Sequence, residues 1–284
     1  DAAELPELLA ADDARPKVHL AARPGEISAE ELALITGGTE GTLSPYAVHL
    51  DSGDPGTMEP VKDRLATVQD EGSQVVAVAM SRAPLVGEDG GRWLDLCAGP
   101  GGKAVMLGAL AESEGATVTG IEISEHRTDL VRAATKGLPV KVHTADGRDP
   151  GLEPGFDRVL VDAPCSGLGA LRRRPEARWR KTAADIQGLV VLQRALLDSA
   201  LRLVRPGGVV LYTTCSPHLS ETVSVIREAA RRPDVELLDV REFLTGADGT
   251  PIEDLGDGPW VQLWPHRHGT DAMFMAALRR SDDA

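Results

Sequence analysis

From residue 66 onward, short apolar runs alternate with longer segments whose apolar residues recur at helical spacing. This alternation is typical of βαβ units around a largely parallel sheet, so we predict an α/β fold with a doubly wound sheet. The tail of the chain adds two expected strands, 260–263 and 273–277. The other expected strands are 93–96, 118–122, 140–143, 158–162 and 209–213, and the expected helices are 69–77, 103–113, 125–136, 182–204 and 221–231.

The first 65 residues differ from the rest in composition and patterning, because Pro, Gly, Asp and Ser recur and apolar runs are short. We therefore expect two units, a small N-terminal one over 1–65 and a main domain over 66–284. The 284-residue chain opens with Asp1 rather than Met, so we expect it to be part of a longer protein that lacks an upstream domain.

A glycine-rich turn follows the first expected strand of the main domain. Its glycines allow a tight turn and a close approach of the backbone to a ligand, and the next helix N-terminus favours negative charge. Glu122 ends the second strand about 20 residues later, where a carboxylate can accept hydrogen bonds from ribose hydroxyls. Asp146 follows the third strand and would contact an adenine amine, and Asp162 ends the fourth. The turn consists of Cys97, Ala98, Gly99, Pro100, Gly101, Gly102 and Lys103.

These features predict a nucleotide-like cofactor at the carboxyl ends of the strands. Gly99-x-Gly101-x-x-Ala104 also fits the dinucleotide fingerprint, so a nicotinamide-dependent dehydrogenase is an alternative.

Two of the three cysteines lie in loops at strand ends, Cys165 in the loop 162–167 and Cys215 after the strand 209–213. A thiolate is a usual protein nucleophile for an electron-poor ring carbon, so both are candidate catalytic residues. For Cys97 we expect a packed side chain. The sequence has no C-x-x-C pair and no close His–Cys spacing, so we expect no metal site.

The charge of the chain does not favour bulk attraction to nucleic acid, because 30 basic and 44 acidic residues give a net charge of −14. The segment 172–181 is an exception and predicts a phosphate-contacting patch. Within it, Trp179 is a candidate either to stack on a base or to pack in the core. The cations of the segment are Arg172, Arg173, Arg174, Arg178, Arg180 and Lys181.

The sequence shows no apolar leader and no apolar run of 18 or more residues, and it has few cysteines. We therefore expect a cytoplasmic protein with no membrane segment.

Four spaced motifs closely resemble those of the Sun/Fmu-type (NOL/NOP/Sun family) ribosomal RNA cytosine-5 methyltransferases. They are the turn 97–103, the loop 162–167, Thr214-Cys215-Ser216 and His266-x-His268-Gly269-Thr270-Asp271. The resemblance runs from about Val68 to Leu278. It implies a class I methyltransferase fold, S-adenosylmethionine as cofactor, and a small N-terminal α+β subdomain in the position of the family's RNA-binding unit.

The resemblance further implies an RNA substrate, with 16S ribosomal RNA of the small subunit as the first candidate, and a missing NusB-type N-terminal domain. We expect Arg127 at the cofactor site and a monomeric protein. Family members usually have alanine at the position of Gly99, and we expect that change to leave the turn intact.

By the same resemblance, Cys215 attacks C6 of cytosine and Cys165 assists release of the product. The residues alone leave this division open, because DNA cytosine-5 methyltransferases attack with the cysteine of a Pro-Cys motif, the position of Cys165. Lys103 is expected to favour the thiolate, and Asp162 to hydrogen-bond N3 or the amine of the base. A non-catalytic RNA-binding assembly factor is the main alternative. We expect His266 and His268 to tie the last hairpin together.

Overall fold

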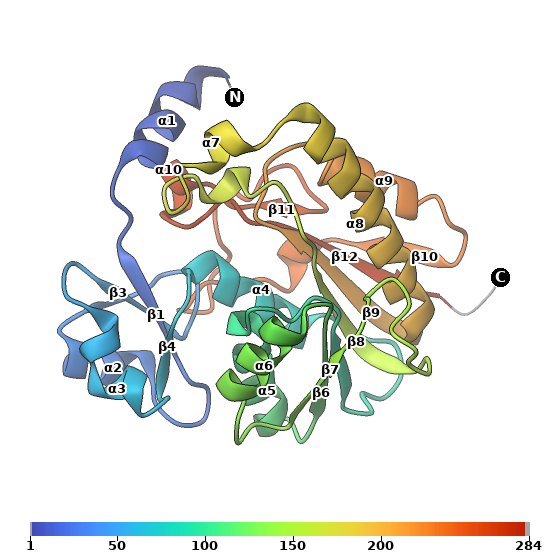
Figure 1. Ribbon diagram of the computed structural model, residues 1–284, viewed down its shortest axis with the longest axis horizontal. Coiled ribbons are helices and arrows are strands. Elements are labelled where there is room, and N and C mark those ends of the chain that lie inside the picture. Colours follow the sequence, from blue (N-terminus) through green and yellow to red (C-terminus); the bar gives the residue numbers. More distant parts are fainter. Residues whose placement is uncertain (1, 282–284) are drawn as a thin grey trace.

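The computed structural model describes residues 2–281, and Figure 1 shows its layers. A central sheet has the strand order β10-β12-β9-β8-β5-β6-β7, and β11 pairs with β12. The five strands from β9 to β7 in this order pair in parallel, which confirms the predicted doubly wound α/β fold. These strands are β5 (Arg92–Asp95), β6 (Thr117–Glu122), β7 (Val140–Thr144), β8 (Phe156–Asp162) and β9 (Val204–Thr214).

One edge of the sheet is antiparallel, because β12 (Phe274–Arg280) inserts between β9 and β10 (Val235–Leu238). The sequence predicted β12 but missed β10, a short strand with two buried positions. The expected tail hairpin exists as β11 (Val261–Gln262) and β12, but the segment that joins its strands includes a short helix, α10 (Pro265–His268).

Helices cover both faces of the sheet (Figure 1). On one face, α4 (Glu71–Arg82) and α5 (Gly102–Ser113) pack against Trp93 and Leu160. On the other face, α8 (Ala183–Leu203) and α9 (Val223–Ala229) pack against residues such as Val159. Neighbouring positions of β8 therefore face opposite cores, as the pleat of a strand requires. Helix α6 (Glu125–Ala134) packs on β6 and β7.

The N-terminal part forms a separate antiparallel sheet in the order β2-β3-β1-β4, with a core that includes Leu20, Leu32 and Val48. This confirms the small α+β unit. Its last strand ends at Val68, and the division at residues 65 and 66 stays a prediction. The elements are α1 (Leu5–Asp13), β1 (Val18–Ala22), α2 (Ala29–Thr36), β2 (Thr39–Glu40), β3 (Ala47–Leu50), α3 (Glu59–Lys62) and β4 (Ala66–Val68).

The remaining elements are short. They are α7 (Ala177–Arg180) and the 3₁₀ helices η1 (Ala2–Glu4), η2 (Pro55–Thr57), η3 (Leu168–Ala170) and η4 (Val240–Glu242). Within residues 2–281, no helix combines the length and the apolarity needed to cross a bilayer.

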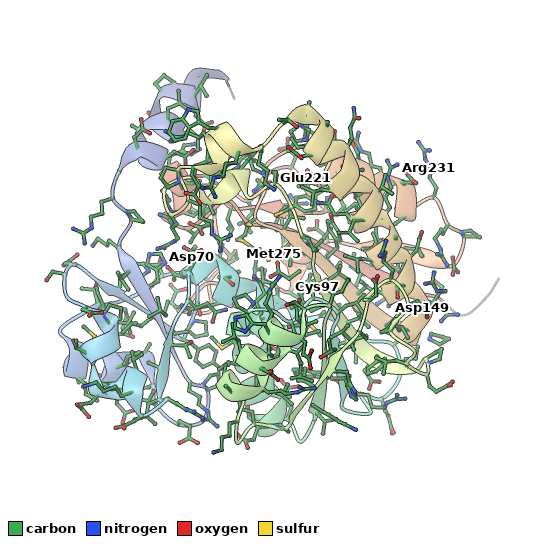
Figure 2. The ribbon with its side chains drawn as sticks, in the orientation of Figure 1. Asp70, Cys97, Asp149, Glu221, Arg231 and Met275 are labelled. Atoms are coloured by element: carbon green, nitrogen blue, oxygen red, sulfur yellow. The ribbon has the colours of Figure 1, made fainter. Side chains whose placement is uncertain are left out.

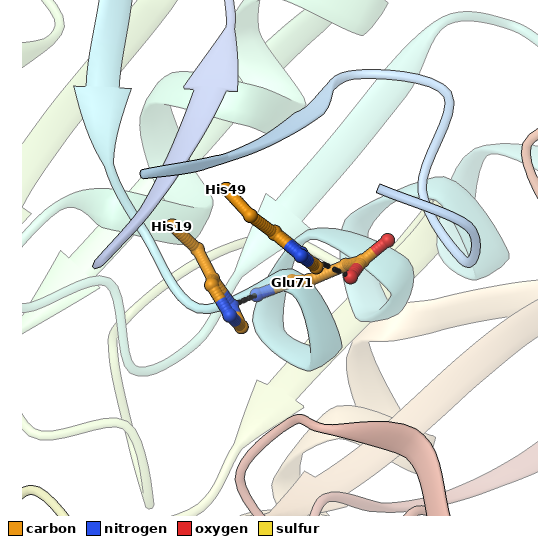
Figure 3. A group of neighbouring side chains, drawn as sticks. All are labelled: His19, His49 and Glu71. Carbon is orange, nitrogen blue, oxygen red and sulfur yellow. Dashed lines mark hydrogen bonds and ion pairs between the residues drawn. The ribbon is translucent and has the colours of Figure 1, made fainter. Parts of the chain in front are cut away.

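A polar cluster joins the small sheet to the start of α4 (Figure 3). The Glu71 carboxylate accepts backbone N–H groups of Leu43 and Ser44 and pairs with His49 Nε2 at 2.7 Å, while the Glu71 N–H donates to His19 Nδ1. The two imidazole rings stack with centroids 4.1 Å apart. These three side chains lie close enough to share a metal ion. His19 Nδ1 accepts the Glu71 N–H, and the Glu71 carboxylate already binds His49 and two backbone N–H groups, so we interpret the cluster as a structural joint.

Candidate active site

A pocket of about 800 Å³ opens at the carboxyl ends of the parallel strands, where open α/β sheets bind ligands. The structure brings nine of the predicted catalytic and cofactor-binding residues to its lining. Ala98, Gly101 and Gly102 form the turn behind it, and Lys103 reaches it through its contact with Asp162. The nine lining residues are Cys97, Gly99, Pro100, Glu122, Arg127, Asp146, Asp162, Cys165 and Cys215.

The glycine turn is tighter at Gly99 than the sequence predicted. An added Cβ there would overlap the Glu122 carboxylate and come within 2.8 Å of the Arg127 guanidinium. Arg127 Nη2 donates to the carbonyl oxygen of Gly99 at 2.6 Å and lies 3.4 Å from Glu122 Oε2. The Glu122 and Arg127 atoms that the Cβ would meet lie at the ends of flexible side chains, which can move aside, so the expectation that alanine leaves this turn intact stays a prediction. Gly101 has φ +120°, a conformation that favours glycine.

The acids at the next two strand ends offer hydrogen-bond acceptors to the pocket. Glu122 is 5% exposed and accepts the Ser124 N–H at 2.9 Å. Asp146 accepts several hydrogen bonds from Arg148, which hold the pKa of this carboxyl below its ordinary value. Ile123 also lines the pocket, and 65% of it is exposed, so an apolar surface lies beside the acids.

Asp95, at the end of β5, is a site residue that the sequence analysis missed. Burial, and next the charge of Asp162, raise its pKa to about 7. One carboxylate oxygen accepts the Cys97 N–H at 3.2 Å, and the other is buried without a hydrogen-bond partner. An acid at the last position of a strand, directly before a glycine turn, was the signal that could have found it.

Lys103 extends from the first turn of α5 to Asp162, with 2.8 Å between Nζ and Oδ2. Burial acts to lower the pKa of Lys103, but the charge and hydrogen bond of Asp162, together with the charges of Cys215 and Asp95, outweigh it and the net direction is upward. The lysine therefore stays cationic beside the two cysteine loops.

The two predicted catalytic cysteines meet, with 3.4 Å between their Sγ atoms. The hydrogen bond from Cys165 lowers the pKa of Cys215 against the effect of burial, and Lys103 acts in the same downward direction. The pKa of Cys165 is raised well above its ordinary value by the hydrogen bond to Cys215 and by burial. For Cys97, burial and the charge of Asp95 raise the pKa of the thiol, so it is a poor thiolate. Cys215 is thus the most acidic of the three thiols.

Within the part of the chain that the structure describes, three of the six cations in the basic segment form ion pairs, and the other three do not. Arg172 and Arg173 both pair with Asp70 and Asp271 at 2.9–3.1 Å, so the expectation that they contact phosphate is wrong. Arg178 pairs with Asp13. The other three cations have no ion-pair partner among residues 2–281 and line the pocket; they are Arg174, Arg180 and Lys181.

Trp179 lies among these cations with 77% of its surface exposed, so the alternative of a packing role is wrong. The sequence predicts that His266 and His268 tie the last hairpin together. This holds for His268, because Trp264 N–H donates to His268 Nδ1 at 2.9 Å. For His266 the partner lies outside the hairpin, since its Nε2 is 2.9 Å from Glu4 Oε2 in the N-terminal segment.

A Rossmann-like sheet with a glycine turn, strand-end acids and an antiparallel strand beside the last parallel one defines a class. This is the fold of the S-adenosylmethionine-dependent methyltransferases. Residues 83–279 match the sequence model of the 16S rRNA methyltransferase RsmB/F family, and the chain belongs to that family.

Relatives extend the match over nearly the whole chain. Rv1407 of Mycobacterium tuberculosis, whose name only proposes methyltransferase activity, is 61% identical over 98% of this chain and 60% of its own length. Ribosomal RNA small subunit methyltransferase B of Klebsiella pneumoniae is 35% identical over 96% of this chain and 61% of its own. The chain thus spans about three fifths of the length of these curated relatives.

Solved structures share the fold. The crystal structure of PH0851 has a TM-score of 0.85 at 26% identity and covers 98% of this chain and 63% of its own. NSun6 from Pyrococcus horikoshii with SFG has a TM-score of 0.79 at 18% identity over 99% of this chain and 95% of its own, and shows the fold alone.

Proposed function

We propose that this chain transfers a methyl group from S-adenosylmethionine to C5 of a cytosine in RNA, with 16S ribosomal RNA as the first candidate. The observation that carries the proposal is the pair of thiols 3.4 Å apart beside the Lys103–Asp162 ion pair. Membership of the RsmB/F family and the name of the Klebsiella relative support a ribosomal RNA substrate. A dehydrogenase would need neither cysteine.

The pocket has the donor and acceptor set that the cofactor requires. Glu122 would accept hydrogen bonds from the ribose hydroxyls, Ile123 would cover one face of the adenine, and Asp146 would accept from its amine. Gly99 and Gly101 carry no side chain, so the backbone of the turn can approach the ligand closely. When bound, S-adenosylmethionine supplies an electrophilic methyl group.

The protein's part of the chemistry begins at Cys215. Its thiolate attacks C6 of cytosine, a C6–S bond forms, and the displaced electron pair makes C5 nucleophilic. The Asp162 carboxylate would accept a hydrogen bond from the exocyclic amine and so orient the base. Lys103 stabilises the thiolate before attack, in keeping with the lowered pKa of Cys215.

Release of the product requires transfer of the C5 proton to a base, for which solvent water suffices, and cleavage of the C6–S bond, whose electron pair returns to the Cys215 sulfur. Cys165 keeps its proton at neutral pH, because its pKa is raised, and its sulfur is 3.4 Å from that of Cys215. It lies near enough to pass a proton to the departing sulfur. We therefore assign attack to Cys215 and assistance in release to Cys165.

The RNA would reach the pocket as a single strand or with the target base flipped, because the ring face must meet the thiolate. Arg174, Arg180 and Lys181 would contact phosphates, and Trp179 would stack on a neighbouring base. Such a substrate implies a cytoplasmic enzyme, and we propose that it acts as a monomer without a metal.

The test is a denaturing-gel assay for a covalent protein–RNA adduct, with S-adenosylmethionine and ribosomal RNA that lacks 5-methylcytosine. We expect the adduct to accumulate in Cys165→Ala and to be absent in Cys215→Ala. The reverse pattern would move the nucleophile to Cys165. If no variant forms an adduct although each binds the cofactor and the RNA, the non-catalytic assembly factor is the better interpretation.

A further inference from the structure

Each catalytic cysteine is followed by a serine, and both serines bond to one carboxylate. Ser166 Oγ donates to Glu221 Oε2 at 2.5 Å, and Ser216 Oγ donates to the same oxygen at 2.7 Å. The backbone N–H of Ser166 donates to Oε1 at 2.8 Å. Glu221 and Ser216 are completely buried and Ser166 is 2% exposed, so this contact is shielded from water.

The rest of the molecule holds Glu221 in place from two sides. Gln193 of α8 donates to Oε1 at 3.1 Å and to the carbonyl oxygen of Pro164 at 2.9 Å, and the Tyr212 hydroxyl donates to the backbone carbonyl of Glu221 at 2.7 Å. Figure 2 shows Glu221 near the start of α8. Four donors fill the acceptor capacity of the carboxylate, which therefore has one available orientation.

The Glu221 carboxylate has no cationic partner among residues 2–281. A buried, unpaired carboxylate is costly, and an amide or a packed apolar side chain would fill the same space at lower cost. Burying this carboxylate therefore costs more free energy than is needed only to join two loops. We infer that both the position of the loops and the negative charge between them matter to the site.

We propose that Glu221 is a positioning residue that clamps the two cysteine loops together and fixes the separation of the two thiols. It does not line the pocket, so it acts through Ser166 and Ser216 and not by touching substrate. This inference rests on the proposed function for its catalytic consequence, but the clamp itself can be tested on the protein alone.

The charge of Glu221 affects the two thiols unequally. The hydrogen bond to Cys215 and burial raise the pKa of Cys165, and Glu221 acts in the same direction. The pKa of Cys215 depends mainly on the hydrogen bond from Cys165 and on burial, and then on the charges of Asp162, Lys103 and Asp271. Glu221 thus helps to keep the proton on Cys165, where it can be donated to the Cys215 thiolate.

The primary test measures alkylation of the purified protein by iodoacetamide from pH 6 to pH 10, with each cysteine peptide quantified by mass spectrometry. In the wild type we expect Cys215 to react ahead of Cys165. Glu221→Gln removes the charge, and the amide nitrogen cannot accept the hydrogen bonds of the carboxylate oxygen that it replaces, so the ratio of Cys215 to Cys165 modification should fall about tenfold. The matched control is Glu228→Gln on α9, which removes an exposed ion pair with Arg194 of α8 and should leave the ratio unchanged.

Methyl transfer is measured in parallel under single-turnover conditions. We expect Glu221→Gln to lose on the order of 100-fold in rate, because a small displacement of a reacting group has an effect of this size. Its dissociation constant for S-adenosylmethionine should change less than about twofold, since Glu221 does not touch the pocket.

The outcomes separate the clamp from the reaction. If Glu221→Gln does not fold, the double variant Ser166→Ala/Ser216→Ala removes only the hydroxyls and must show the same loss of alkylation preference. Wild-type alkylation ratios in a folded variant of either kind would overturn the inference. If the wild type itself does not methylate RNA while the ratio still changes in the variants, the proposed function fails and the clamp stands.

Discussion

Cys165 and Cys215 have the same local sequence, a cysteine before a serine at a strand end, and opposite acidities in the fold. The pKa of Cys215 is lowered by the hydrogen bond from Cys165 and then by Lys103, whereas that of Cys165 is raised by the hydrogen bond to Cys215 and by burial. The pair shares one hydrogen bond, so stabilising the thiolate on one sulfur disfavours it on the other. The asymmetry comes from the neighbours, with a lysine beside one thiol and a carboxylate beside the other.

Lys103→Met should shift the pH dependence of Cys215 toward alkaline pH. Loss of the cation raises the pKa of Cys215, and only the thiolate reacts, so less of the reactive form exists at neutral pH. We expect a fall on the order of tenfold in adduct formation at pH 7 that is recovered at higher pH.

Asp162→Asn should shift the pH dependence of Cys215 alkylation in the direction opposite to Lys103→Met, because the charge of Asp162 raises the pKa of Cys215. Its iodoacetamide profile should move toward acidic pH. Equal profiles in Lys103→Met and the wild type would show that the lysine does not act on the thiol.

At the scale of elements, the site depends on how the loop after β8 is joined to the loop after β9 and to the segment before β12. Gly169, in η3, donates its N–H to the Cys215 carbonyl oxygen at 2.9 Å, and its own carbonyl accepts the Ala272 N–H at 2.8 Å. One residue therefore bonds to both neighbouring segments. Three motifs that are far apart in the sequence meet at this point.

Gly169→Ala should force these segments apart. The added Cβ would lie 2.5 Å from the Ala272 carbonyl oxygen and 2.8 Å from that of Cys215, and both are backbone atoms that cannot rotate away. We expect a loss of about 1–3 kcal/mol in the free energy of unfolding, measured in urea, with reduced adduct formation.

The matched control is Gly188→Ala on the exposed side of α8, where a Cβ meets nothing within 4 Å. This change should instead add about 1 kcal/mol, because alanine has the higher helix propensity. Equal stability of the two variants would contradict the tight contact at Gly169.

For the whole molecule, the question is how a chain of net charge −14 would hold RNA. The fold neutralises Arg172 and Arg173 with Asp70 and Asp271, residues from either end of the main domain. It leaves other cations free at the pocket, so the attractive charge is concentrated where the base must enter. The acidic remainder of the surface would repel RNA that binds elsewhere.

The double variant Arg180→Ala/Lys181→Ala should weaken RNA binding and make it less sensitive to salt. Each phosphate contact on a single strand contributes a slope of about 0.7 in a plot of log affinity against log salt, so the slope should fall by about 1.4. Fluorescence anisotropy with a ribosomal RNA fragment between 50 and 200 mM salt, about the range over which such contacts weaken, measures it. Lys136→Ala, an exposed cation beyond the far end of α6, should leave the slope unchanged, and an unchanged slope in the double variant would exclude these phosphate contacts.

The sequence by itself determined the order of strands and helices from residue 92 to residue 214, because apolar periodicity directly reflects which face of each element is buried. It also predicted the acids at the strand ends, Glu122, Asp146 and Asp162, since parallel strands bring such positions to one edge. The strand β10 was missed because a short edge strand has little periodicity, and Asp95 was missed although its place at a strand end before the glycine turn could have indicated it.

Only the tertiary structure decided which cations are free and how the cysteines are held. Arg172 and Arg174 are equivalent in the sequence, yet one is buried between Asp70 and Asp271 and the other faces the pocket. Likewise, no local signal connects Glu221 to Ser166, 55 residues earlier. Local sequence sets the conformation of each segment, but pairing of charges and hydrogen bonds depends on which distant segments packing brings within about 3 Å.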